Sequence, residues 1–317
     1  MKNNTYYFIS PMSKEIVDTV IKVGEKTKCF GLIPTRRQVD FSSGYVNNWK
    51  TDSFSKYIDG RVPILRDHGG PEQGDVSDDG LNSISIDARN FQIIHIDPWI
   101  KYTDFDQGLQ YTIDTISLIY SINPEVKYEV LTEEAIRRFS YEEMDNFIKK
   151  LFTILPKEVS NNINYGVIQS GVSIDLVDQK NTGVFDLNRL RKMIEINRNY
   201  RLLSKEHNGD YLSFKNIKSR FENGLDSLNI GPEIAQIETL TILNELDDSE
   251  IEGWYNNCIE SNKWKRWETP NFNLNNKRQV IKVCGHYNRV NTVLPDFKVK
   301  VKKNLENKLN ELYEATK

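Results

Sequence analysis

Eight short apolar runs, separated by longer segments with helical spacing, constrain the fold of this 317-residue chain more than any other feature. Strands that alternate with helices favour parallel pairing through right-handed crossovers. Eight such units predict a (β/α)8 TIM barrel, and a doubly wound open sheet is the alternative that the same pattern allows. The expected strands are residues 6–10, 29–34, 62–66, 91–96, 127–131, 165–169, 200–204 and 227–230.

The chain is longer than a barrel needs. Such barrels typically take roughly 250 residues, so we expect the barrel in residues 1–250 and a C-terminal extension in 251–317. We expect this extension to pack on the barrel or on a partner subunit, with a strand at 280–284 and a charged closing helix at 298–314. The helices expected within the barrel are 13–26, 107–122, 132–152, 187–197, 214–223 and 232–246.

Composition excludes several classes of function. The net charge of -3 provides no basic field that would gather nucleic acid or an anionic membrane surface. We see no signal peptide and no apolar stretch of the roughly 18 residues that a membrane span needs. Three widely spaced cysteines form neither a disulfide framework nor a paired-cysteine zinc motif. We therefore expect a cytoplasmic protein that binds neither nucleic acid nor membranes.

Three of the four histidines lie at or near the ends of expected strands. His68 follows the third strand, His95 lies on the fourth and His207 follows the seventh. Barrel enzymes place their active sites where the strands end, and histidine and carboxylate ligands from different strands can hold a divalent metal there. The alternative is a set of structural, hydrogen-bonded histidines. The carboxylates expected at the same rim are Asp67, Asp97, Glu129 and Glu133.

Two arginines after the second strand, Arg36 and Arg37, suit bidentate binding of a carboxylate or phosphate. A surface pair bridged to acidic residues is the alternative. Glycines in the segments 68–71 and 229–232 permit close backbone approach to a ligand at a strand-to-helix turn, although such pairs also mark ordinary turns.

Several short motifs occur together in one order. They are Arg37-Gln38-Val39-Asp40, Asp67-His68-Gly69-Gly70-Pro71, His95-Ile96-Asp97, Tyr128-Glu129-Val130-Leu131-Thr132-Glu133, Glu206-His207-Asn208-Gly209-Asp210-Tyr211, Asn229-Ile230-Gly231-Pro232 and His286-Tyr287-Asn288-Arg289-Val290. In this order they resemble the tagatose-bisphosphate aldolase Z-type subunit family over about residues 6–297. That family is similar to the class II fructose- and tagatose-bisphosphate aldolases, which are zinc barrels.

The resemblance implies roles for individual residues. Asp67 resembles the catalytic aspartate, His68 the first metal ligand and His207 a second, while Glu129 or Glu133 supplies a catalytic carboxylate. Class II aldolases carry a further ligand histidine after the sixth strand, where this chain has Gln169. The third ligand therefore stays open among His95, Asp97, Glu133 and His286, and His95 is our first choice.

The same resemblance implies a sugar site. Acidic Asp210 and Glu233 stand where those aldolases bind phosphate, so we expect any anion to be bound elsewhere. The residues expected to contact substrate are Arg36, Arg37, Gln38, Asp97, Gln169, Asn208, Asp210 and Arg289.

The function implied is metal-dependent aldol chemistry on a ketose or sugar phosphate. A divalent ion, with zinc expected, would polarise the carbonyl and stabilise an enediolate. Two alternatives remain: a ketose or uronate 4-epimerase that uses the same metal site, and a non-catalytic subunit that stabilises an aldolase. The expected partners are accordingly a sugar or sugar phosphate and either further copies of this chain or an aldolase subunit.

Overall fold

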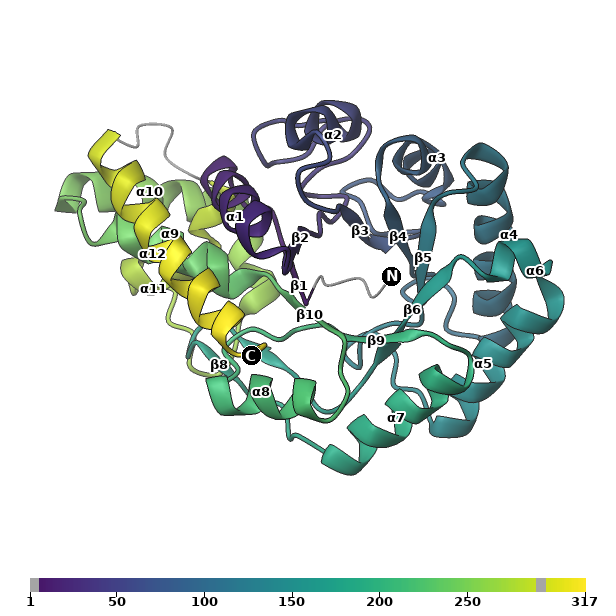
Figure 1. The fold of residues 1–317 in the computed structure, drawn as a ribbon. Coiled ribbons are helices and arrows are strands. Elements are labelled where there is room, and N and C mark those ends of the chain that lie inside the picture. Colours follow the sequence, from purple (N-terminus) through teal and green to yellow (C-terminus); the bar gives the residue numbers. More distant parts are fainter. Residues whose placement is uncertain (1–5, 289–294) are drawn as a thin grey trace.

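Eight parallel strands form the centre of the molecule (Figure 1). The computed structural model describes residues 6–288 and 295–317. Neighbouring strands follow the order β2-β1-β10-β9-β6-β5-β4-β3, and a parallel bridge between Leu32 and Ile64 joins the two ends of this series. The prediction of a (β/α)8 barrel is therefore confirmed. The strands are β1 (Tyr7–Ile9), β2 (Phe30–Leu32), β3 (Leu65–Gly69), β4 (Ile93–Ile96), β5 (Lys127–Val130), β6 (Ile163–Ile168), β9 (Leu203–Glu206) and β10 (Ser227–Ile230).

Helices surround the strands, as Figure 1 shows. Side-chain caps fix where several of them begin, because an N-cap oxygen accepts a backbone N–H that the helix itself leaves free. Ser13 accepts from the amide of Ile16 at the start of α1, and Asp104 accepts from Gln107 at the start of α4. The helices that follow the strands are α1 (Lys14–Thr27), α2 (Thr51–Ile58), α3 (Leu81–Asn90), α4 (Phe105–Ile122), α5 (Tyr141–Ile154), α6 (Lys157–Ser160), α7 (Leu187–Asn199), α8 (Phe214–Glu222) and α9 (Pro232–Leu243).

The helix expected at 132–152 begins later than predicted, at Tyr141. Ser140 and Glu143 form a reciprocal capping box at that point, and this box fixes the start of α5. Residues 131–139 therefore remain a loop at the end of β5. This loop carries Glu133 into the mouth of the barrel.

The regular elements of the C-terminal segment are all helices where the structure describes it. Its elements are α10 (Asp248–Ser261), η1 (Lys263–Trp267), α11 (Lys277–Cys284), η2 (Gly285–Tyr287) and α12 (Pro295–Glu314). The strand predicted at 280–284 is wrong, because these residues form the second half of α11. Asn276 caps that helix by accepting from the amide of Gln279, and Val280, Ile281 and Cys284 are buried along one helical face.

Helix α12 packs against α1 and α9 on the outside of the barrel (Figure 1). Its buried residues Val301, Leu305, Leu309 and Leu312 recur at intervals of three and four, which is the spacing of one helical face. The Tyr7 hydroxyl on β1 donates a hydrogen bond to the carbonyl of Leu312 at 2.8 Å. Among the described residues, no helix is long and apolar enough to cross a membrane.

Candidate active site

An irregularity in β3 lets two consecutive side chains reach the barrel mouth. Side chains of a regular strand alternate between faces, but the pairing of β3 with β4 shifts register between Arg66 and Gly69. Within this bulge His68 has a φ of 45°, in the left-handed region that non-glycine residues seldom adopt. Asp67 and His68 consequently both line the same pocket.

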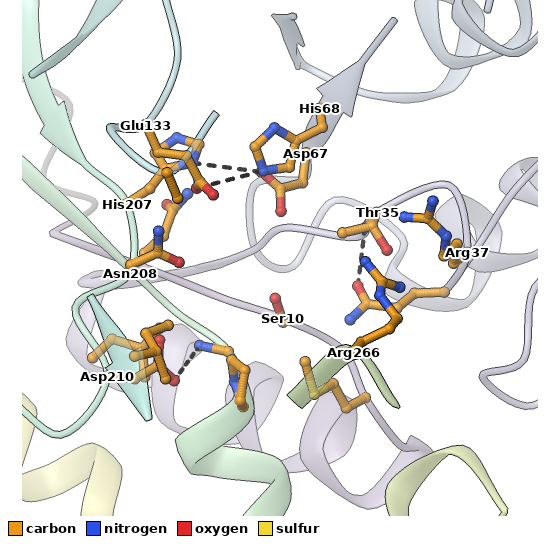
Figure 2. A pocket seen from close by; sticks show the side chains of 18 of the residues that line it. Ser10, Thr35, Arg37, Asp67, His68, Glu133, His207, Asn208, Asp210 and Arg266 are labelled. Atoms are coloured by element: carbon orange, nitrogen blue, oxygen red, sulfur yellow. Dashed lines mark hydrogen bonds and ion pairs between the residues drawn. The ribbon is translucent and has the colours of Figure 1, made fainter. Parts of the chain in front are cut away.

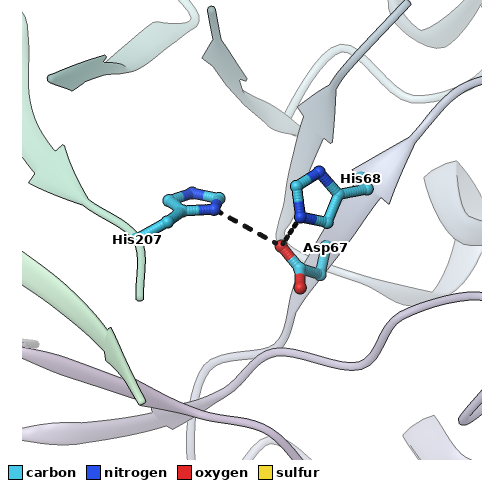
Figure 3. A group of neighbouring side chains, drawn as sticks. All are labelled: Asp67, His68 and His207. Atoms are coloured by element: carbon cyan, nitrogen blue, oxygen red, sulfur yellow. Dashed lines mark ion pairs between the residues drawn. The ribbon is translucent and has the colours of Figure 1, made fainter. Parts of the chain in front are cut away.

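His207, which follows β9, faces His68 across the mouth (Figure 3). The centroids of the two imidazole rings lie 5.5 Å apart. Oδ1 of Asp67 lies 3.6 Å from His68 Nε2 and 3.9 Å from His207 Nδ1. Ligand atoms of these three residues all lie within 4.8 Å of one another, which is close enough to share one ion.

Glu133 supplies a further oxygen to this group from the loop after β5. Its Oε2 lies 3.6 Å from Nε2 of His68 and 3.4 Å from Nδ1 of His207. Burial by itself raises the pKa of Glu133, but the hydrogen bond to His207 and the charge of His68 together bring it down to about 2. The carboxylate is therefore ionised at neutral pH and able to bind a cation.

Each of the two histidines also contacts a carboxylate through the ring nitrogen that points away from Glu133. Nδ1 of His68 is 2.6 Å from Oδ2 of Asp97, and Nε2 of His207 is 2.6 Å from Oε1 of Glu129. Such a contact fixes the ring orientation and directs the opposite nitrogen toward a metal. Burial lowers the pKa of His68, but Asp67 and Asp97 raise it to about 10. The cluster therefore stabilises positive charge at this position.

His95 is close to the group, but backbone atoms engage both of its ring nitrogens. Nε2 contacts the carbonyl of Leu131 at 2.8 Å, and Nδ1 accepts the backbone N–H of His68 at 3.3 Å. Burial lowers the pKa of His95, so its ring is neutral. This arrangement makes His95 the least favourably placed of the three histidines predicted as ligands.

Glu129 lies below the mouth and is fully buried against Lys205 on β9. Oε2 of Glu129 is 2.6 Å from Nζ of Lys205, and neither side chain is exposed to solvent. The Lys205 ammonium lies 4.6 Å from the ring centroid of Phe8 in the barrel interior. Burial raises the pKa of Glu129, but Lys205 and the two neighbouring histidines lower it well below the ordinary value. Glu129 is thus an ionised support, and it is not among the residues that line the pocket.

The residues present fit a divalent metal ion. In a tetrahedral site with ligand bonds of about 2.0–2.1 Å, neighbouring ligand atoms lie about 3.3–3.4 Å apart. The 3.4 and 3.6 Å contacts of Glu133 with the two histidines approach that spacing. Oδ1 of Asp67 is buried and has no hydrogen-bond partner among the described residues, and a cation held by the neighbouring side chains would offset the cost of burying this charge. Among the described residues, four carboxylates gather around one lysine and the two histidines, and this excess of acidic groups favours a bound cation.

A pocket of about 420 Å³ opens from this cluster (Figure 2). Four of the side chains predicted to contact substrate line it: Arg37, Gln38, Asn208 and Asp210. Asn208, with a φ of 58°, follows His207 directly. Arg289, also predicted as a substrate contact, lies outside the described residues.

Three other predicted substrate contacts do not line the pocket. Arg36 is buried, and its two Nη atoms each contact an oxygen of Asp78 at 2.6 Å. Asp97 lies behind His68, as described above. Gln169 is buried in the barrel wall, where it braces the 131–139 loop by donating to the carbonyls of Thr132 and Arg137.

Part of the pocket comes from residues that the sequence analysis did not assign to the site. Arg266, Trp267 and Tyr287 reach it from the C-terminal segment, and Ser10 and Thr35 reach it from the ends of the first two strands. The cluster of tryptophan and basic residues at 264–267 was the available signal. Nothing in its local pattern indicates that it folds over the barrel mouth.

Comparison with known proteins supports the fold. No protein-family model and no curated protein sequence matches the chain. Solved structures do match over nearly its full length. The YdjI aldolase from Escherichia coli K12 is 12% identical with a TM-score of 0.58, and covers 98% of this chain and 92% of its own. This chain has the barrel fold of that aldolase.

Two further aldolases show the same architecture. The fructose-bisphosphate aldolase of Campylobacter jejuni is 11% identical with a TM-score of 0.60, covering 98% of this chain and 90% of its own. A putative fructose-1,6-bisphosphate aldolase from Coccidioides immitis is 12% identical with a TM-score of 0.51, covering 99% and 91% respectively. At such identities the likeness establishes the fold and leaves the chemistry to be argued from the site.

Proposed function

We propose that this protein is a divalent-metal-dependent enzyme of the class II aldolase type that acts on a ketose or sugar phosphate. One observation carries the proposal: His68, His207 and Glu133 converge at the barrel mouth, and each histidine has a carboxylate behind it. The barrel that it shares with solved aldolases is consistent with this chemistry. The sequence resemblance to the tagatose-bisphosphate Z-type subunits remains a prediction.

In this proposal Nε2 of His68, Nδ1 of His207 and Oε2 of Glu133 hold the ion, and zinc is the expected metal. This assigns Glu133 a ligand role and leaves His95 as a support for the backbone of His68. When bound, the metal supplies an electrophile that polarises a ketose carbonyl. The rest of the chemistry belongs to the side chains that line the pocket.

Asp67 is the group that we propose moves the proton. Its carboxylate lines the pocket beside the proposed ligands, and its Oδ1 makes no hydrogen bond within the described residues. A carboxylate so placed can take a proton from a sugar hydroxyl when the adjacent carbon–carbon bond breaks, and can return it in the reverse direction. Glu129 cannot take that role, because Lys205 and His207 enclose its carboxylate below the pocket.

The test combines metal analysis with product analysis. Wild-type protein should bind one divalent ion per chain, and His68→Ala or His207→Ala should abolish that binding while the circular dichroism spectrum is retained. His286→Ala is the matched control, because this fourth histidine is also buried but does not line the pocket. Asp67→Asn should keep the metal and lower turnover by a factor of about 100 or more.

Products then distinguish the competing chemistries. Aldol cleavage yields an aldehyde that a coupled dehydrogenase detects, whereas 4-epimerisation yields an isomer of unchanged mass. Protein that binds metal but turns over no ketose, and raises the activity of an aldolase partner, would indicate the stabilising-subunit alternative. Failure of the wild-type protein to bind any divalent ion would refute the proposed function.

A further inference from the structure

The usual phosphate position of a barrel is already occupied by this chain's own carboxylates. Barrel enzymes commonly bind phosphate after the seventh and eighth strands, at a helix N-terminus. Here Oδ1 of Asp210 accepts the backbone N–H groups of Gly231 and Glu233 at 2.9 and 2.8 Å, where α9 begins. Oε2 of Glu233 accepts the N–H of Tyr211 at 2.8 Å. These donors are taken by Asp210 and Glu233, so the helix N-terminus offers no free N–H group to a further anion.

Positive charge collects on another side of the same pocket. Figure 2 shows Arg37 and Arg266 together, away from Asp210. Among the described residues, Arg37 has one ion pair, with 3.4 Å between its Nε and Oδ1 of Asp75, and Arg266 has none. Burial and the nearby charge of Arg266 lower the pKa of Arg37. The two guanidinium groups therefore form an incompletely neutralised pair that an anion would stabilise.

A third donor lines the pocket from the same loop that supplies Asp75. Gln73 is almost fully buried, and its Nε2 has no hydrogen-bond partner among the described residues. A buried donor left without a partner costs about 1–3 kcal/mol. A polar ligand group in the pocket would remove this cost, so Gln73 is independent evidence for a ligand in this pocket.

We propose that the pocket takes a sugar with an anionic terminal group, a carboxylate or a phosphate, which Arg37 and Arg266 bind with help from Gln73. This inference rests on the proposed function, because it assigns the sugar's reacting end to the His68–His207 cluster. Arg266 lies on η1, outside the eight strand–helix units. The C-terminal segment thereby contributes directly to substrate selection.

Three unreactive polyols of equal carbon length test the inference: glucitol, gluconate and glucitol 6-phosphate. Their dissociation constants are measured by calorimetry on zinc-loaded wild type, Arg37→Gln, Arg266→Gln and Lys265→Gln. Lys265 is the matched control, because it is an exposed cation on the same short helix that does not line the pocket. At least one anionic polyol should bind wild type about tenfold or more tightly than glucitol does.

The variants should distinguish a specific anion site at Arg37 and Arg266 from a general attraction of anions by positive charge. Arg266→Gln and Arg37→Gln should each remove most of the anion preference and leave glucitol binding unchanged, while Lys265→Gln alters neither. The better of the two anions identifies the terminal group. Equal binding of all three polyols, no binding of any, or equal losses in Arg266→Gln and Lys265→Gln would overturn the inference. If the wild-type protein binds no divalent ion but still prefers the anionic polyols through Arg266, the proposed function is refuted and the anion site is retained.

Discussion

Nδ1 of His68 lies 2.6 Å from Oδ2 of Asp97, and this contact turns the opposite nitrogen of the ring toward Asp67 and Glu133. Thr132 holds the same carboxylate oxygen through its hydroxyl at 2.9 Å. A residue at the end of β4 thus orients a histidine from the bulge in β3. The proposed metal site depends on this alignment as much as on the ligands themselves.

We expect Asp97→Asn to weaken zinc binding by about 10- to 100-fold, the usual effect of losing a carboxylate behind a ligand histidine. The loss arises because an amide neither fixes the ring tautomer nor increases its basicity to the same extent. Competition with a chromogenic chelator measures it. Thr132→Val removes only the hydroxyl that holds Asp97 and should weaken zinc binding less than Asp97→Asn does. Wild-type affinity in Asp97→Asn would show that His68 does not bind the metal.

Lys205→Met should destabilise the protein by about 3–5 kcal/mol, the cost of leaving one member of a buried ion pair alone. Glu129 is fully buried, so its charge would lose the ammonium group that lies 2.6 Å away. Urea unfolding of the metal-free protein measures the change. The double variant Lys205→Met/Glu129→Gln should recover part of the loss. If its loss in stability equals the sum of the losses in Lys205→Met and Glu129→Gln, the two residues are not coupled.

Asp210 should make stability fall as pH rises between about 4 and 7. Burial, followed by the charge of Glu233, raises the pKa of this carboxyl from 3.8 to about 7 in the folded protein. The folded state therefore holds a proton that the unfolded state releases in this window, and the free energy of unfolding decreases toward neutral pH. Asp210→Asn should remove this slope. At pH 8 it should be more stable than wild type by roughly 2–4 kcal/mol.

The control for that experiment is the part of the pH profile below about 3, well under the ordinary pKa of an aspartate. There the carboxyl is protonated in both states, so wild type and Asp210→Asn should converge in their urea midpoints. Parallel profiles from pH 4.5 to 8 would show that Asp210 is ionised throughout, and that the backbone N–H groups of Gly231 and Glu233 outweigh its burial.

Apolar runs sufficed to predict the barrel because each buried strand is short and bounded by helical spacing. The same reasoning failed at 280–284, where a run rich in β-branched residues forms a helix. Val280, Ile281 and Cys284 lie at helical intervals, and Asn276 caps the helix that contains them. Periodicity over so few residues does not separate a buried strand from one face of a buried helix.

The convergence of His68 and His207 could also be predicted, since His68 lies near the end of β3 and His207 follows β9, and these strand ends share one rim. The sequence could not predict which carboxylate contacts which histidine. That pairing depends on the bulge between Arg66 and Gly69, which has no local sequence signature. It also depends on the loop that carries Glu133, for which the capping box of Ser140 and Glu143 marks only the end. The contribution of Arg266 was likewise hidden, because it depends on how a distant segment folds back over the barrel.

Position 169 allows a test of whether the absence of a histidine after the sixth strand weakens metal binding. In the aldolases that this sequence resembles, a ligand histidine follows the sixth strand, where this chain has Gln169. Its amide group makes four hydrogen bonds away from the pocket, two donated and two accepted. Nε2 donates to the carbonyls of Thr132 and Arg137 at 2.9 and 2.6 Å, and Oε1 accepts from the Phe139 amide and from Arg189 at 3.0 and 2.9 Å.

We therefore expect Gln169→His to add no ligand. An imidazole cannot satisfy the four partners of Gln169, so the variant should lose about 1–3 kcal/mol of stability for each buried group left unpaired. Zinc affinity should fall rather than rise, because the 131–139 loop that positions Glu133 loses its brace. Gln169→Glu keeps the acceptor but not the two donors, and should be intermediate in urea unfolding and chelator competition. A gain in zinc affinity or turnover in Gln169→His would show instead that residue 169 faces the metal.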